Sequence, residues 1–190
     1  MPGLNDWHLR LALRTLRSGG VIAYPTEAVY GLGCLPQDYD AISCILRLKR
    51  RTLGKGLIIV AASCQQLHPY IEFPGPDTWA QILASWPGPV TWLVPAKKRI
   101  PAWLTGGHAT LAVRVSAHPV IRALCSVAGP LVSTSANPSG YLPAKTPARV
   151  RGYFGMAIDY IVPGKTGPQQ QPTEIREALT GQIIRRSPFT

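Results

Sequence analysis

Short apolar runs alternate with amphipathic segments along this 190-residue chain, and this alternation restricts its fold more than any other feature. Apolar runs predict strands at residues 21–24, 57–61, 90–94, 111–115, 131–133 and 158–162. The run 57–61 contains only apolar side chains, as is typical of a strand that is buried on both faces. Residues 173–178 and 182–186 flank Thr180-Gly181 and predict a hairpin.

Helical periodicity appears between these runs. Leu9, Ala12, Leu13 and Leu16 lie on one helix face, and Gly19-Gly20 ends that helix. Further helices are predicted at residues 41–48, 77–85, 119–127 and 147–154. Because helices and strands alternate throughout, we expect an α/β or α+β fold with a mixed sheet. Residues 165–171 are polar and rich in glycine, proline and glutamine, which predicts a mobile loop.

Length and composition restrict the class of protein. The chain fits a single domain over residues 1–190, and 46% hydrophobic residues can supply its core. No apolar run approaches the roughly 20 residues that span a bilayer, so no membrane contact is expected. The four cysteines, whose spacing fits no zinc site, are Cys34, Cys44, Cys64 and Cys125. We therefore expect a cytoplasmic protein with reduced cysteines and no metal site of its own.

The charge of the chain is strongly unbalanced. Twenty lysines and arginines face nine acidic residues, which gives a net charge of +11. Such an excess in general favours anionic partners, namely nucleotides, RNA or a membrane surface, of which the membrane is not expected here. A soluble protein that merely has a basic isoelectric point is the alternative.

Lys49, Arg51 and Lys55 form a cationic cluster directly before the apolar run 57–61. One interpretation is a solvated helix end, where cations complement the helix dipole by about 0.3–1 kcal/mol. The other is an anion site, since three cations beside a buried strand repel one another unless an anion lies among them. A triphosphate fits this second interpretation, because planar guanidinium groups bind phosphate well.

Arg114 and the segment from Ser133 to Asn137 are the other candidates. Arg114 interrupts an apolar strand, so it either points to water from an edge strand or enters a cleft to bind a carboxylate. Ser133, Ser135 and Asn137 follow or end a strand, where they either cap a helix or bind a ligand. Gly31 and Gly33 follow the strand-to-turn junction 24–27, where exposed backbone allows close approach.

Several known motifs are excluded. Gly164-Lys165-Thr166 looks like the end of a phosphate-binding P-loop, but Asp159 occupies the position of the first glycine. The dinucleotide motif Gly-x-Gly-x-x-Gly is absent. The scattered histidines, which we interpret as surface or capping residues, are His8, His68, His108 and His118.

Four motifs together resemble one known family. In order they are residues 25–33 (PTEAVYGLG), Lys49-x-Arg51, residues 112–114 (AVR) and Ser135-Ala136-Asn137. In this respect the chain is similar to the short, single-domain bacterial members of the YrdC-like family, from about residue 21 to residue 185. The resemblance implies an open, twisted mixed sheet with helices on its faces and a deep basic cavity.

The resemblance also implies a reaction. Threonine and bicarbonate form a carbamate that attacks the α-phosphate of ATP, giving L-threonylcarbamoyl-AMP and pyrophosphate, so the family member is a nucleotidyltransferase. Downstream threonylcarbamoyl-transferase proteins then modify an adenosine of tRNA. Magnesium is expected to enter with ATP, and direct contact with tRNA is a further possibility.

Site residues follow from the same resemblance. It implies that Lys49 and Arg51 are catalytic and that the threonine site contains Thr26, Arg114 and Ser133. The residues implied to bind ATP are Lys49, Arg51, Lys55, Thr110, Ser135, Asn137 and Arg185. The positions at which this chain differs from many members of the family are Ala28, Thr52, Lys55 and Val60.

An RNA-binding module without catalysis is the alternative function. In that interpretation the net positive charge holds tRNA or structured RNA, and binding weakens steeply with salt. The sequence lacks the Gly-x-x-Gly of a KH domain and the aromatic pattern of an RRM, which favours the enzyme.

Overall fold

The computed structural model of the protein describes residues 4–169 and 173–185. The strands are β1 (Ile22–Pro25), β2 (Tyr30–Gly33), β3 (Ile58–Ala61), β4 (Val90–Pro95), β5 (Thr110–Val115), β6 (Leu131–Ser135), β7 (Tyr160–Ile161), β8 (Glu174–Glu177) and β9 (Ile183–Arg185). The α-helices are α1 (Asp6–Arg17), α2 (Tyr39–Lys49), α3 (Pro76–Ala84), α4 (Ala102–Thr105), α5 (Pro119–Ala128) and α6 (Pro147–Phe154). Short 3-10 helices are η1 (Leu53–Lys55), η2 (Cys64–Leu67) and η3 (Gly155–Ala157).

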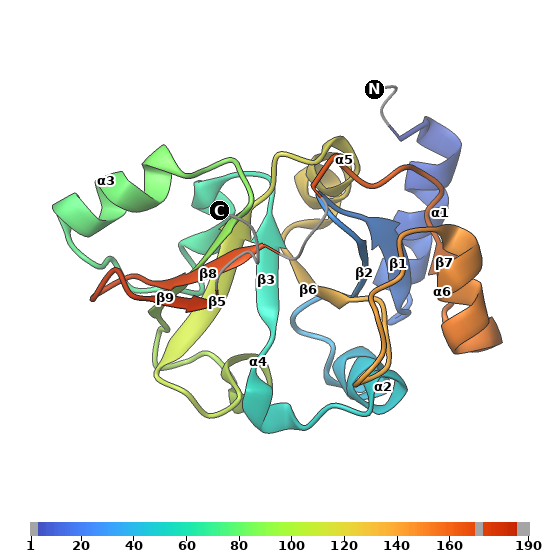
Figure 1. Cartoon of the computed structure of the whole chain (residues 1–190), viewed down its shortest axis with the longest axis horizontal. Coiled ribbons are helices and arrows are strands. Elements are labelled where there is room, and N and C mark those ends of the chain that lie inside the picture. Colours follow the sequence, from blue (N-terminus) through green and yellow to red (C-terminus); the bar gives the residue numbers. More distant parts are fainter. Residues whose placement is uncertain (1–3, 170–172, 186–190) are drawn as a thin grey trace.

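In the described residues the strands form one nine-stranded sheet in the order β7-β1-β2-β6-β3-β5-β4-β8-β9. Strand β6 lies near its middle and pairs antiparallel with both β2 and β3. Strands β3 and β5 are parallel, as are β4 and β8, whereas β4 and β5 are antiparallel. The sheet extends along the long axis of the molecule, with β9 at one edge of the sheet and β7 at the other (Figure 1). The expected mixed sheet with helices is therefore confirmed.

Alternating side chains of the strands supply two hydrophobic clusters. Ile59 and Ala61 belong to one cluster with residues of α2, α3 and α6, whereas Val60 belongs to the other with α1 and α5. Because neighbouring side chains of a strand point to opposite faces, the two clusters lie on opposite faces of the sheet. This explains why the run 57–61 is apolar without interruption.

Helix ends are encoded locally. The side chain of Asn5 accepts a hydrogen bond from His8 N and starts α1, and Asp38 does the same for α2 through Ala41 N. Helix α2 ends at Lys49, and its C-cap residue Arg50 adopts a left-handed conformation with φ of 50°. This conformation is uncommon for a residue other than glycine, and it turns the chain sharply between Lys49 and Arg51.

The predicted elements were found, with some differences. Helix α6 has the bounds that its sequence pattern predicts. Strand β2, which contains Gly31 and Gly33, was not predicted as a strand, and neither the short helix α4 nor the 3-10 helices were predicted. Strand β6 extends to Ser135, and β7 is shorter than the run 158–162. Residue 186 of the predicted hairpin lies outside the described residues.

The predicted mobile loop is held by several hydrogen bonds. Gly167 N donates to Thr26 O at 2.9 Å, and Gln169 N donates to Glu27 O at 3.2 Å. Gln170 and Gln171 of that prediction lie outside the described residues. Among the helices that the structure describes, none combines the length and apolarity that crossing a membrane requires.

Gly33 yields a first prediction, because its site has no room for a side chain. A Cβ there would lie 2.4 Å from the Val132 carbonyl oxygen and 2.8 Å from the Tyr24 ring. We expect Gly33→Ala to lower the free energy of unfolding by about 1–3 kcal/mol, the usual effect of overpacking, as measured by urea denaturation. Gly152→Ala is the control, since its Cβ would contact nothing within 4 Å. Equal stability of the two variants would contradict this account of β2.

Candidate active site

A cavity of about 400 Å³ opens beside the centre of the sheet. This size suits a small-molecule ligand. Its walls come from the β1–β2 turn, the segment after α2, strands β5 and β6, and the hairpin β8–β9. Segments that are far apart in the sequence therefore meet around one space.

Eight of the ten predicted site residues line this cavity. They are Thr26, Arg51, Lys55, Thr110, Arg114, Ser133, Ser135 and Arg185. Lys49 and Asn137 do not line it. The cationic cluster and the polar end of β6 thus meet in one place, as the sequence motifs suggest.

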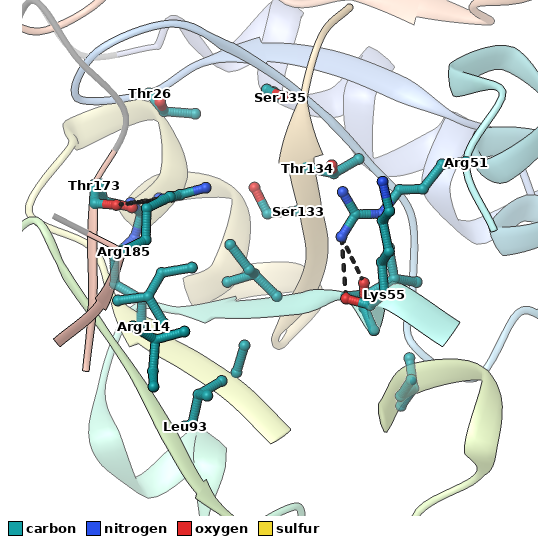
Figure 2. A pocket seen from close by; sticks show the side chains of 18 of the residues that line it. Thr26, Arg51, Lys55, Leu93, Arg114, Ser133, Thr134, Ser135, Thr173 and Arg185 are labelled. Atoms are coloured by element: carbon teal, nitrogen blue, oxygen red, sulfur yellow. Dashed lines mark hydrogen bonds between the residues drawn. The ribbon is translucent and has the colours of Figure 1, made fainter. Parts of the chain in front are cut away.

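The cations lie on two sides of the cavity. Arg51 and Lys55 occupy one side, whereas Arg114 and Arg185 occupy the other, with Ser133 between them (Figure 2). A molecule that carries an anionic group at each end would therefore find cations at both ends.

Arg51 is held by backbone carbonyl groups and forms no ion pair among the described residues. Its Nη2 donates to Lys55 O at 3.1 Å and to Gly56 O at 3.0 Å. Burial lowers the pKa of the guanidinium, and its buried Nε has no hydrogen-bond partner in the described structure. Because guanidinium carries five donors, several remain for an anion.

Arg185 lies on the opposite side and is fixed by the backbone. Its Nη2 donates to Thr173 O at 2.7 Å. Burial, and then the nearby charges of Arg114 and Arg51, lower its pKa. Arg185 lies on the same side of the cavity as Arg114 (Figure 2).

Arg114 is a buried residue of an interior strand, since β5 lies between β3 and β4. The alternative of an exposed edge-strand residue is therefore wrong. Its Nη2 lies 3.3 Å from Oε2 of Glu27, a buried carboxylate. Glu27 was not identified from the sequence, although a buried arginine requires an anion and the chain offers only nine acidic residues.

Lys49 is buried beneath the loop that follows β6. Its Nζ donates to the carbonyl groups of Ser135 and Asn137, the latter at 2.9 Å. Burial, and then the charge of Arg51, lower the pKa of Lys49 to about 8. Lys49 O in turn accepts from Ser139 N at 2.7 Å. Lys49 therefore fastens this loop to the end of α2.

Asn137 makes its contacts within the same loop. Its Nδ2 donates to Tyr141 O at 2.7 Å and to Pro138 O at 3.0 Å. Its Oδ1 is buried without a hydrogen-bond partner in the described structure. No described helix begins directly after residue 135, so the helix-cap interpretation of this segment is wrong.

Two of the histidines that were interpreted as surface or capping residues have further contacts. His108 is exposed, as interpreted, and also lines the cavity, where its Nε2 lies 2.8 Å from Gly54 O. His118 occupies the N-cap position of α5, but it is buried and its side chain forms no capping hydrogen bond. The sequence offers no signal for either place, because both depend on how the strands pair.

Comparisons with known proteins agree with this geometry. A sequence model named Sua5_yciO_yrdC, with the description "telomere recombination", matches residues 14–187. The threonylcarbamoyl-AMP synthase of Halorhodospira halophila is 54% identical over 187 residues, which cover 97% of each chain. That of Pseudomonas aeruginosa is 50% identical over 183 residues, covering 96% of this chain and 98% of the relative.

Solved structures show the same fold. Sua5 of P. abyssi in complex with L-threonine superposes with a TM-score of 0.84 and 33% identity, over 91% of this chain. This chain spans 51% of that longer protein. YciO of E. coli superposes with a TM-score of 0.86 and 26% identity, over 99% of this chain and 94% of YciO. The chain belongs to the Sua5/YciO/YrdC family.

The position of Lys49 generates a second prediction. We expect Lys49→Met to lower the free energy of unfolding by about 1–3 kcal/mol, since it leaves the Ser135 and Asn137 carbonyl groups without their donor. Lys55→Met, which removes a cation from the cavity wall, should leave the unfolding free energy nearly unchanged. Urea denaturation of both variants measures this. Equal stabilities would mean that Lys49 does not fasten the loop.

Proposed function

We propose that this protein is a threonylcarbamoyl-AMP synthase, which makes L-threonylcarbamoyl-AMP from L-threonine, bicarbonate and ATP. The observation that carries the proposal is the single cavity with Arg51 and Lys55 on one side and Arg114 and Arg185 on the other. ATP presents phosphates and threonine presents a carboxylate, so the substrates together match both cationic sides. Identity of about one half to synthases over nearly the whole chain supports it.

In this proposal the reaction joins threonine, as its carbamate, to ATP in the middle of the cavity. The threonine amine and bicarbonate lose water to form a carbamate, whose oxygen attacks the α-phosphorus. The bond between that phosphorus and the bridging oxygen breaks, and pyrophosphate leaves. Such a transfer requires alignment and neutralisation of charge more than a strong protein base.

The site residues have distinct proposed roles. Arg51 and Lys55 bind the phosphates and stabilise the leaving pyrophosphate. Lys49 acts catalytically through the Ser135–Asn137 loop that it fastens, and that loop with Thr110 binds the nucleotide. Arg185 contacts the nucleotide where the two substrates meet. Arg114 binds the threonine carboxylate, with Thr26 and Ser133 beside it.

Magnesium enters as part of the ATP substrate in this proposal. Among the described residues, no group of three His, Cys, Asp or Glu side chains is placed to hold a metal ion. Oxygen atoms of phosphates and water are the ligands that Mg²⁺ prefers, so the triphosphate supplies them.

The wider setting follows from the product. We propose a single catalytic domain over residues 1–190, in the cytoplasm, whose product is passed to a threonylcarbamoyl-transferase for tRNA modification. The alternative of an RNA-binding module without catalysis is not supported by the relatives, which are named as synthases.

Pyrophosphate release tests the reaction. Purified protein with Mg²⁺-ATP should release pyrophosphate only when both threonine and bicarbonate are present. A carbon dioxide-depleted buffer without bicarbonate is the control for the second substrate. Release that does not depend on threonine would contradict the proposed reaction.

Arg114→Lys tests the amino-acid side. The charge next to Glu27 remains, but the fork of donors is lost, so we expect the KM for threonine to rise about tenfold or more. Arg51→Lys is the matched variant on the phosphate side and should chiefly impair ATP use. Steady-state kinetics with each substrate varied in turn measures both, and equal damage to both substrates by Arg114→Lys would contradict the assignment.

A further inference from the structure

Glu27 lies directly behind the cavity wall that Thr26 forms. Its carboxylate is buried, with Oε1 accepting from Ser116 Oγ at 2.5 Å and Oε2 lying 3.3 Å from Arg114 Nη2. Burial raises the pKa of Glu27, but Arg114 and Ser116 together outweigh burial and hold that pKa below its usual range. Glu27 is therefore a carboxylate that forms a buried ion pair with the Arg114 guanidinium, although its Oε2 accepts no hydrogen bond in the described structure.

A chain of hydrogen bonds supports Glu27 from behind. Ser116 is fully buried and accepts from His118 N at 3.1 Å, which orients its hydroxyl toward Glu27. His118 Nε2 lies 3.3 Å from Lys165 O. These contacts therefore connect Glu27 to the segment 163–169, which we call the strap.

The strap also binds the backbone next to Glu27. Gly167 N donates to Thr26 O at 2.9 Å, and Gln169 N donates to Glu27 O at 3.2 Å. A Cβ at Gly167 would lie 2.6 Å from Glu27 O and 3.0 Å from Glu27 Cα. The strap can approach this closely only because residue 167 has no side chain.

We propose that Glu27 is a positioning residue that holds the Arg114 guanidinium for an amino-acid carboxylate, and that the strap holds Glu27 in place. The inference rests on the proposed function, in which Arg114 binds that carboxylate. Glu27 itself does not line the cavity, so it acts through Arg114. The guanidinium keeps free donors, since its Nε has no hydrogen-bond partner in the described structure.

Glu27→Gln tests the first part, because it keeps the shape of the side chain and removes its charge. We expect the KM and the calorimetric Kd for threonine to rise about tenfold or more, because the buried Arg114 guanidinium loses its paired charge. The KM for ATP and kcat at saturating threonine should stay within about twofold. A purely structural role would instead impair both substrates together, which would overturn the inference.

A double-mutant cycle shows whether Glu27 acts through Arg114. In the Arg114→Lys background, where the fork is already lost, Glu27→Gln should raise the threonine KM by much less than in the wild type. Additive effects of the two substitutions would overturn the inference.

Gly167→Ala tests the strap and keeps both charged side chains, Glu27 and Arg114, while its Cβ would displace the backbone of Glu27. We expect a threonine KM several times higher with an unchanged ATP KM, whereas the control Gly152→Ala should match the wild type. An unchanged threonine KM in Gly167→Ala would overturn the role of the strap.

The same measurements separate this inference from the proposed function. A wild type that releases no threonine-dependent pyrophosphate would contradict the function. A wild type that does so, with Glu27→Gln binding threonine equally well, would overturn only the role of Glu27.

Discussion

The buried ion pair between Arg114 and Glu27 is the interaction on which the rest of the site depends. Four cations line one cavity, and Arg114 is the buried one. Removing its charge from water is unfavourable unless negative charge compensates. Glu27 neutralises this charge from behind the wall. In the described residues, Arg51, Lys55 and Arg185 form no ion pair, so the cavity keeps an excess of positive charge. The pair thus permits a cation in the middle of an apolar sheet and leaves three cations of the cavity wall without an acidic partner among the described residues.

Much of the fold could be predicted because the relevant signals are local. Periodic apolar residues, side-chain caps and prolines at helix starts define α1, α5 and α6 within a few residues of their observed bounds. Strand β2 was missed because its two glycines are typical of turns. These glycines are required by tertiary packing, because a side chain at Gly31 would meet Thr26 and Ser133, and one at Gly33 would meet Val132. No property of the segment itself reveals these neighbours.

The site was predictable to the extent that each motif lies at the end of an element. Cations after α2 and hydroxyl groups at the end of β6 meet because β6 pairs with both β2 and β3. Sequence spacing could not show that Arg51 lines the cavity whereas Lys49 does not. This difference depends on the left-handed conformation of Arg50. Glu27 could not be identified from the sequence for a similar reason. Its contacts are with Ser116 and Arg114, residues about ninety positions later in the chain.

Thr26 and Arg185 both line the cavity although they are far apart in the chain. The residues of the cavity wall are therefore synthesised at different times. A ribosome delivers the sheet from β1 onward, and α1 to α6 can pack before the hairpin β8–β9 has emerged. The wall that Thr173 and Arg185 provide is added last. A nascent or prematurely terminated chain can therefore acquire most of its hydrophobic core while its ligand cavity stays open on one side, and binding competence arrives only with the final strand.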